Sequence, residues 1–207
     1  MNKKLSDILF DIYRGVYRLP AVDKHLQWTQ VRRMDLLHSI HDGIPIGGIT
    51  VLLTGMEIEV RDDLTPSPLK DPIRPLHEYV LDGHNRLHTL YSVFGSGAVA
   101  RRLRNGSEPL TGDKSGVCFN CKTDMFTDDL SSLDPLIPAE DFLNPHKMIK
   151  HVRGLDRDQM SCHKLERAVY AIESCLMDVV QFASNDRGLA QTSFTRMSRG
   201  EGGLVFL

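Results

Sequence analysis

A short polar run in the middle of the chain combines the residue types that chemistry on phosphate requires. The run is Asp82-Gly83-His84-Asn85-Arg86, and it stands where an apolar strand pattern, Tyr79-Val80-Leu81, changes to a helical pattern. The N-terminus of a helix presents unpaired backbone N–H groups and the positive end of the helix dipole, and both suit a phosphate group. Glycine allows that backbone to approach a ligand closely. The spacing therefore predicts an anion-binding turn over residues 82–86.

The side chains of this turn offer several kinds of chemistry. Asp82, at the end of the strand, can hold Mg²⁺ or orient a water molecule. Arg86 can donate two parallel hydrogen bonds to a phosphate group, and the backbone amides from Gly83 to Asn85 add further donors. His84 can relay a proton, because an imidazole titrates near neutral pH. The alternative is a structural turn in which Asp82 caps the helix and the other polar side chains face solvent.

A second set of candidate phosphate ligands stands near the end of the sequence. It consists of Arg196, Ser198, Arg199 and Gly200, which we expect in a glycine-rich terminal loop. Guanidinium groups there can neutralise phosphate charge and stabilise the charge that develops on a leaving group. The alternative is a solvated chain end that binds no ligand.

A small basic cluster is formed by Arg101, Arg102 and Arg104. It stands in a segment rich in Gly, Ser and Arg, which we expect to be a loop. Such a cluster can bind the DNA backbone without reading its sequence, and salt would weaken that binding strongly. An ordinary solvated loop explains the same three residues equally well.

A histidine pair keeps a metal site open as an alternative. His84 and His88 lie four residues apart on the expected helix, so both rings can face one metal ion. Asp82 or His77 could complete the site. This pattern leaves a metal-dependent nuclease as a further candidate function.

The four cysteines are expected to be free thiols. Cys118 and Cys121 have the spacing of half a zinc site, but the sequence has no second Cys-x-x-Cys pair. In a strand, moreover, the two thiols would point to opposite faces. Cys162 and Cys175 fall on an expected helix, and we interpret all four residues as core cysteines.

The pattern of apolar residues predicts a mixed α/β fold that positions these groups. Strands are expected at residues 49–53, 79–81 and 117–119. Helices are expected at residues 29–40, 84–94 and, as one long amphipathic helix, 165–180. Irregular connections rich in Pro or Gly are expected at residues 61–77, 95–116 and 135–145.

The composition is that of an ordinary globular protein. The 207 residues include 25 Lys and Arg against 27 Asp and Glu, which gives a formal net charge of -2, and 41% of the residues are hydrophobic. Any nucleic-acid contact therefore needs a local basic patch. No stretch approaches the roughly 20 apolar residues of a membrane helix, and no apolar run of signal-peptide length follows the first lysines. We expect a cytoplasmic protein without membrane contact.

Three segments, in this order along the chain, resemble the GmrSD-type restriction proteins, specifically their N-terminal ParB/sulfiredoxin-like domain. An early block contains Arg18-Leu19-Pro20, Trp28 and Gly43-Ile44-Pro45-Ile46-Gly47. The central run Asp82-Gly83-His84-Asn85-Arg86 is similar to the Asp-Gly-Gln-Gln-Arg signature of that family. The late run from Phe194 to Glu201 resembles its Phe-x-Arg-Leu-Asn-x-Arg-Gly block.

The resemblance implies a domain that binds and hydrolyses nucleoside triphosphates with Mg²⁺ in a prokaryotic or phage-borne DNA restriction system used in phage defence. The residues that match the family motifs are Asp82, Gly83, Arg86, Arg196, Arg199 and Gly200. His84 and Asn85 replace the two glutamines, and Ser198 replaces the usual asparagine. These departures leave open a non-catalytic DNA-binding or regulatory partner that has the same fold.

The implied architecture is one ParB/sulfiredoxin-like domain over residues 1–207. Its core is expected at about residues 15–130, and a helical C-terminal extension at about residues 155–207. The HNH nuclease domain that often accompanies this domain is absent from the sequence. This leaves three alternatives open, namely a fragment of a longer protein, a stand-alone variant, and one subunit that works with a separate nuclease subunit. The other partners that the resemblance implies are the nucleoside triphosphate and DNA. The sequence does not indicate an oligomeric state.

Overall fold

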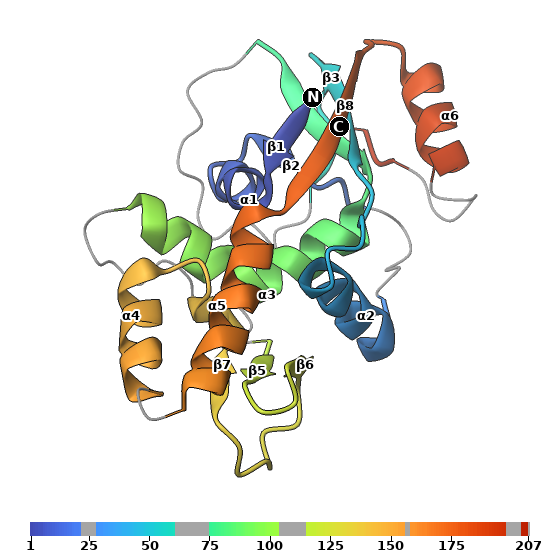
Figure 1. Ribbon diagram of the computed structural model, residues 1–207. Coiled ribbons are helices and arrows are strands. Elements are labelled where there is room, and N and C mark those ends of the chain that lie inside the picture. Colours follow the sequence, from blue (N-terminus) through green and yellow to red (C-terminus); the bar gives the residue numbers. More distant parts are fainter. Residues whose placement is uncertain (22–27, 61–74, 104–114, 156–157, 198–203, 207) are drawn as a thin grey trace.

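The computed structural model describes residues 1–21, 28–60, 75–103, 115–155, 158–197 and 204–206. It has a mixed α/β fold, which confirms the expected fold class (Figure 1). The main sheet has five strands in the order β1-β8-β3-β4-β2. These strands are β1 (Asn2–Lys4), β2 (Tyr17–Arg18), β3 (Ile49–Thr54), β4 (His77–Asp82) and β8 (Leu176–Ala183).

The pairing of β3 with β4 places the expected phosphate-binding turn at one end of these strands, next to the residues that precede β3. β3 runs parallel to β8 and antiparallel to β4, with Ile49 opposite Val179 and Thr50 opposite Asp82. A register shift between Thr50 and Val51 interrupts the pairing of β3 with β4 at this end of the strands. Because β4 ends where β3 begins, Asp82 lies beside the glycines that precede β3.

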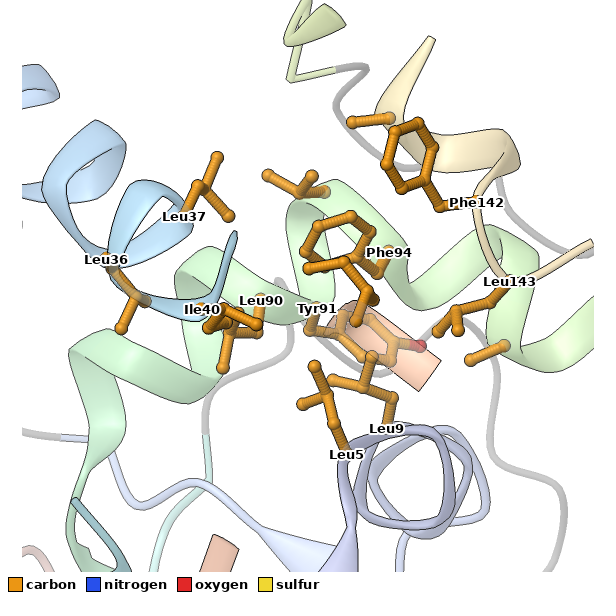
Figure 2. Packing of buried hydrophobic residues seen from close by; sticks show 14 of the residues in the cluster. Leu5, Leu9, Leu36, Leu37, Ile40, Leu90, Tyr91, Phe94, Phe142 and Leu143 are labelled. Carbon is orange, nitrogen blue, oxygen red and sulfur yellow. The ribbon is translucent and has the colours of Figure 1, made fainter. Parts of the chain in front are cut away.

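Four helices of the described residues supply most of the helical side chains in the larger hydrophobic core, and α4 (Pro145–Gly154) adds Met148. The four helices are α1 (Leu5–Tyr13), α2 (Gln30–His41), α3 (His84–Arg102) and α5 (Gln159–Ser174). Figure 2 shows α2 turning Leu37 and Ile40 toward α3, which presents Leu90 and Phe94. α1 adds apolar residues at helical spacing, Leu5, Ile8, Leu9 and Ile12, all of them buried.

A second, smaller core lies under α6 (Arg187–Met197). Side chains alternate along a strand, so neighbouring residues of β4 join different cores. Val80 belongs to the larger core, whereas Tyr79 and Leu81 pack in the smaller one with Phe194 and Leu204. The main sheet is therefore covered on both faces.

A small antiparallel sheet lies at the opposite end of the molecule from the main sheet (Figure 1). Its strand order is β6-β5-β7, with β5 (Cys118–Asn120), β6 (Met125–Thr127) and β7 (Leu136–Pro138). A 3-10 turn, η2 (Ala139–Asp141), and α4 (Pro145–Gly154) follow. The rings of Phe119 and Phe126 lie 5.4 Å apart, and Phe94 of α3 packs 6.2 Å from Phe126. This aromatic cluster attaches the small sheet to the larger core.

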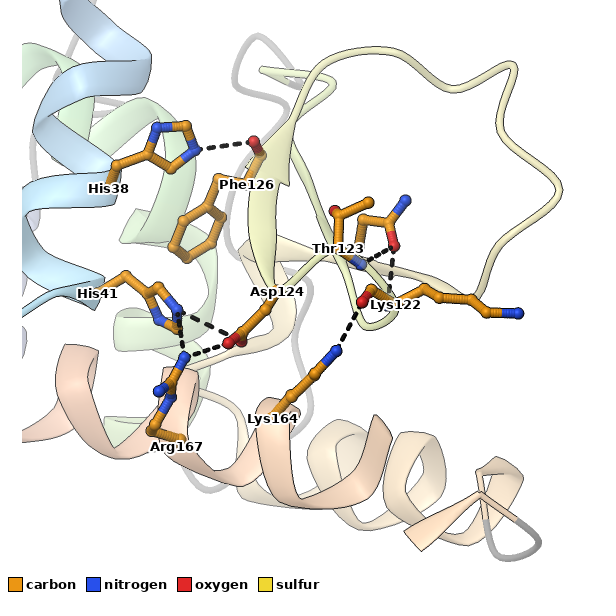
Figure 3. A network of polar contacts seen from close by, with 9 residues as sticks. His38, His41, Lys122, Thr123, Asp124, Phe126, Lys164 and Arg167 are labelled. Atoms are coloured by element: carbon orange, nitrogen blue, oxygen red, sulfur yellow. Dashed lines mark hydrogen bonds and ion pairs between the residues drawn. The ribbon is translucent and has the colours of Figure 1, made fainter. Parts of the chain in front are cut away.

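A polar cluster also joins the small sheet to α2 and α5 (Figure 3). Asp124, in the turn between β5 and β6, forms an ion pair with Arg167 of α5, and its Oδ1 lies 3.4 Å from Nε2 of His41 on α2. Arg167 also lies 3.2 Å from the same His41 nitrogen. Asp124 has a φ of 63°, a left-handed conformation that Asp tolerates better than most residues. We call these three residues the His41–Asp124–Arg167 cluster.

Several expected elements are confirmed, and others are wrong. The helix expected at residues 29–40 and the strands expected at 49–53 and 79–81 are present as α2, β3 and β4. The expected helix at 165–180 is wrong in its second half, because α5 ends at Ser174 and β8 follows. β8 lies inside the main sheet between β1 and β3, so the C-terminal part is not a helical extension of a finished core.

Two expected connections are also partly wrong. α3 continues through residues 95–102, which we expected in a loop, and residues 135–145 include β7 and the start of α4. Residues 61–74 and 104–114, which complete two of the expected connections, lie outside the described residues. In the described part of the chain, no helix is long and apolar enough to cross a membrane.

Candidate functional site

The turn between β4 and α3 is built on a glycine that its backbone and its neighbours both require. Gly83 is the N-cap of α3 and has a φ of 95°, in the left-handed region that favours glycine. A Cβ atom at this position would lie 2.8 Å from Cγ2 of Ile49. We expected Gly83 to be small so that a ligand could approach the backbone. Packing against β3 already explains the glycine without a ligand.

Arg86 extends from the first turn of α3 to the start of β3. Its guanidinium donates a hydrogen bond to the backbone carbonyl of Gly48, and it lies 3.6 Å from Oδ2 of Asp82. A Cβ atom on Gly47 would lie 3.0 Å from the same guanidinium, so a larger residue there would displace Arg86. The side chain of Arg86 is 18% exposed and that of Asp82 is 43% exposed. Two of the predicted catalytic residues therefore meet, and the carboxylate is open to solvent.

The first turn of α3 suits an anion. Among the described residues, no side chain caps this helix, and its first turn contains no acidic residue. The backbone N–H groups at the start of the helix, including those of His84 and Asn85, have no acceptor within α3 itself. His84 and Asn85 are half-buried, and Arg86 adds a positive charge one residue later. The helix dipole and this guanidinium both favour negative charge at the corner.

A groove opens beside Arg86. It has a volume of about 360 Å³ and is shallow and largely open to solvent. Arg86 contributes from α3 and Ile46 from the approach to β3, and the remaining lining residues belong to α2 or precede it directly. These remaining residues are Trp28, Arg32, Asp35, Leu36 and Ser39. The volume is at the lower end of the range for small-molecule sites, about 300–1,000 Å³. The groove can therefore hold more than a single phosphate group.

The late segment reaches the central motif through an aromatic contact. The rings of Phe194 and His84 lie 5.7 Å apart and are nearly perpendicular. Phe194 is buried, whereas Arg196, two residues further along α6, is exposed in the last turn of that helix. We expected Arg196 in a terminal loop, and that placement is wrong. Ser198, Arg199 and Gly200 lie outside the described residues.

The basic cluster predicted to bind DNA is placed differently from our expectation. Arg101 and Arg102 lie in the last turn of α3, not in a loop. Arg101 pairs with Glu173 of α5 at 2.6 Å, and Arg102 pairs with Asp7 of α1. These ion pairs join three helices and neutralise part of the positive charge. Arg104 lies outside the described residues.

The part of the chain that the structure describes contains no cluster of metal-ligating side chains that would support the zinc or nuclease hypotheses. No group of three or more His, Cys, Asp or Glu side chains there is arranged to hold a metal ion, and this includes His84 and His88. Asp82 still fits the way in which proteins hold Mg²⁺ on a nucleotide, because one or two carboxylates suffice when phosphate oxygens complete the coordination. Asp82 is then the protein residue that would hold the ion.

The four cysteines are free thiols, as expected. Burial raises the pKa of the Cys121 and Cys175 thiols to about 11, and it also raises the pKa of Cys118. A thiol with such a pKa stays protonated near neutral pH, and it is then a poor metal ligand and nucleophile. We therefore assign these cysteines to packing.

Sequence reasoning missed the α2 side of the groove. Trp28 entered the sequence analysis only as part of the early block, and in the structure it packs against the larger core and also lines the groove. Arg32, Asp35 and Ser39 were not singled out. Their spacing of three and four residues on one face of a helix that starts beside Trp28 was the available signal.

No protein-family model and no curated protein sequence matches this chain.

Proposed function

We propose that the corner between β4, α3 and α2 binds the triphosphate of a nucleotide with Mg²⁺, and that the protein is a nucleoside triphosphatase of the GmrSD type in a DNA restriction system. One observation carries the proposal. Residues from all three segments that resemble this family lie around the same corner. Trp28 and Ile46 of the early block line one groove with Arg86 of the central motif, and Phe194 of the late block contacts His84.

The roles of the side chains follow from their exposure and contacts. Asp82 has an open carboxylate that can hold Mg²⁺ or orient water, whereas Arg86 is fixed by its bond to the carbonyl of Gly48. A fixed guanidinium loses little freedom on binding and stabilises charge on a phosphate group. The amides that begin α3 add donors, and His84 can exchange a proton with water or with a leaving phosphate.

The test is phosphate release from each of the four nucleoside triphosphates with Mg²⁺, with and without DNA. We expect release by the native protein and loss of release in Arg86→Ala and Asp82→Asn. Matched controls are Arg14→Ala and Asp42→Asn, which change exposed residues at the ends of α1 and α2 that do not line the groove. Release that survives in both site variants, or that falls equally in the controls, would contradict the proposal.

A further inference from the structure

The groove beside Arg86 contains side chains that a triphosphate alone does not need. An indole, a carboxylate and a hydroxyl line it, from Trp28, Asp35 and Ser39. Asp35 and Ser39 are four residues apart on α2, so they lie on one face of the helix. A carboxylate repels a phosphate group unless a metal ion lies between them, and Asp82 already provides a carboxylate for such an ion beside Arg86. The α2 side of the groove is therefore suited to a different part of the ligand from the Arg86 side.

Trp28 offers a flat surface whose position is fixed. The residue is half-buried and packs against the larger core, next to Thr29, which caps α2. Only part of the indole is covered, and the part that lines the groove can stack on an aromatic ring. A nucleotide base is an aromatic ring of this kind, whichever base it is. Stacking therefore predicts a nucleotide but does not select among the bases.

The carboxylate of Asp35 can distinguish one nucleotide base from the others. It is exposed at the groove, and within the described residues it forms no ion pair. An ionised carboxylate is an acceptor with two oxygens. Guanine presents two adjacent donors on one edge, the N1–H and the 2-amino group, and can donate one hydrogen bond to each oxygen. Adenine presents one amino group beside the acceptor N1, and uracil presents one N–H between two carbonyl oxygens.

We propose that the groove binds a guanine nucleotide, with the base stacked on Trp28 and its donor edge paired with Asp35. This inference rests on the proposed function, because the triphosphate is assigned to Arg86 and the start of α3. Arg32 lies on the same face of α2 as Asp35 and supplies a second guanidinium for the charge of the nucleotide. The hydroxyl of Ser39 donates to the backbone carbonyl of Asp35 at 2.7 Å, so it faces the ligand as an acceptor.

The experiment uses the single tryptophan of the chain as its signal. The full-length protein is titrated with GTP, ITP, ATP and inorganic tripolyphosphate, each with Mg²⁺, while tryptophan fluorescence and bound ligand are measured. We expect GTP to bind at least about tenfold more tightly than ATP and to change the fluorescence of Trp28. ITP lacks the 2-amino group and should bind with an intermediate Kd. Tripolyphosphate should bind without a fluorescence change.

Two variants separate the base site from the phosphate site. Asp35→Asn should raise the Kd of GTP to that of ATP and leave tripolyphosphate binding unchanged. Asp42→Asn, an exposed aspartate at the end of the same helix that does not line the groove, should leave the Kd of GTP unchanged. Circular dichroism establishes that each variant is folded.

The outcomes distinguish the two proposals. If GTP and ATP bind equally and Arg86→Ala abolishes both, the guanine assignment is overturned and the proposed function stands. An equal effect of Asp35→Asn and Asp42→Asn also overturns the assignment, because it shows a general effect of charge. If neither tripolyphosphate nor any nucleotide binds the folded protein, the proposed function itself is overturned.

Discussion

The Arg86–Asp82 pair at the groove and the Arg167–Asp124 pair at the small sheet use the same two residue types in different surroundings. Arg167 pairs with Oδ2 of Asp124, and Oδ1 of Asp124 lies 3.4 Å from Nε2 of the buried His41 ring without forming a hydrogen bond (Figure 3). The side chain of Asp124 is 22% exposed. Asp82, by contrast, is 43% exposed and faces Arg86 at 3.6 Å, which is longer than a hydrogen bond.

The two carboxylates differ in whether a ligand could take the place of their present partners. Asp124 connects three elements, α2, α5 and the β5–β6 turn, and a ligand could replace its partners only by separating them. Asp82 can bind an ion or water without breaking any element apart, because solvent already reaches it. We therefore expect changes at Asp124 to reduce stability and changes at Asp82 to reduce activity.

The largest expected effect tests this contrast directly on phosphate release. Asp82→Asn should lower the rate of release by about 100-fold, the lower end of what a positioned acid or base contributes. Asp124→Asn should change the rate less than about twofold at a temperature where both variants are folded. The measurement is the initial rate of phosphate release at saturating nucleotide. Equal losses in the two folded variants would remove the distinction between the pairs.

The glycines that precede β3 should show the next largest effect. A Cβ atom on Gly48 would clash with the backbone carbonyl of Asp178 on β8 and lie 2.9 Å from its Cβ. Since a backbone cannot give way as a side chain can, Gly48→Ala should lower the free energy of unfolding by about 2–3 kcal/mol. Urea unfolding measures this change.

Gly154, in the last turn of α4, is the matched control. A Cβ atom there would meet no atom within 4 Å, and the backbone is helical. Gly154→Ala should therefore raise the free energy of unfolding by roughly 0.5–1 kcal/mol, because alanine loses less backbone freedom in a helix. If the two substitutions had the same sign, the close approach of β3 and β8 at Gly48 would not explain the glycine.

The third effect is the stability that the His41–Asp124–Arg167 cluster contributes. Asp124→Asn keeps a side chain that tolerates the positive φ, so the substitution removes charge without adding backbone strain. We expect a loss of about 1–2 kcal/mol in the free energy of unfolding, less than for a fully buried pair because Arg167 is 54% exposed. Asp82→Asn, at the more exposed pair, should cost less than about 0.5 kcal/mol.

A double-mutant cycle then identifies the source of that loss. Arg167→Met keeps the length of the side chain and removes its charge. If the pair interacts as its geometry indicates, the two substitutions together should cost about 1 kcal/mol less than the sum of the separate losses. An additive result would assign the loss to Asp124 alone, for example to its contact with His41.

The sequence was sufficient where one local signal decided the structure. The helix at α2 has its cap, Thr29, and its stop, Gly43, in the sequence, and the strand–turn–helix around Asp82 follows from one change of periodicity. The prediction for β8 was wrong because Leu176, Val179 and Val180 continue the helical spacing of α5, so the segment was expected to be helical. Only pairing with β1 and β3, distant in the chain, makes this segment a strand.

The candidate site shows the same division. Asp82 and Arg86 could be predicted because they are four residues apart, and a strand end followed by a helix places them together. The contact of Arg86 with Gly48 and the groove shared with Trp28 depend on tertiary packing between segments 38 or more residues apart. No local pattern encodes such distances. α1 was missed although Leu5, Ile8, Leu9 and Ile12 have helical spacing.

The smallest effect concerns the start of α5, the helix that carries Arg167. Asp158 caps this helix by accepting hydrogen bonds from the backbone N–H of Ser161 at 3.1 Å and from its hydroxyl at 2.6 Å. These hydrogen bonds hold the pKa of Asp158 below its ordinary value. Since the ionised form is favoured in the folded protein, the stabilisation is complete above the pKa of the unfolded chain, about 3.9, and is lost as the pH falls through the lower folded value.

Asp158→Ala should therefore lower the Tm by a few degrees at pH 7, and the difference from the native protein should shrink as the pH falls below about 4. Asp42→Ala, which removes an exposed aspartate at the C-terminal end of α2, should not lower the Tm at pH 7. Thermal unfolding followed at pH 7, 5 and 3 measures both variants. A difference for Asp158→Ala that stays constant from pH 7 to pH 3 would show that the carboxylate charge is not what stabilises α5. The cap would then act through hydrogen bonds that a protonated Asp158 carboxyl group also accepts from Ser161.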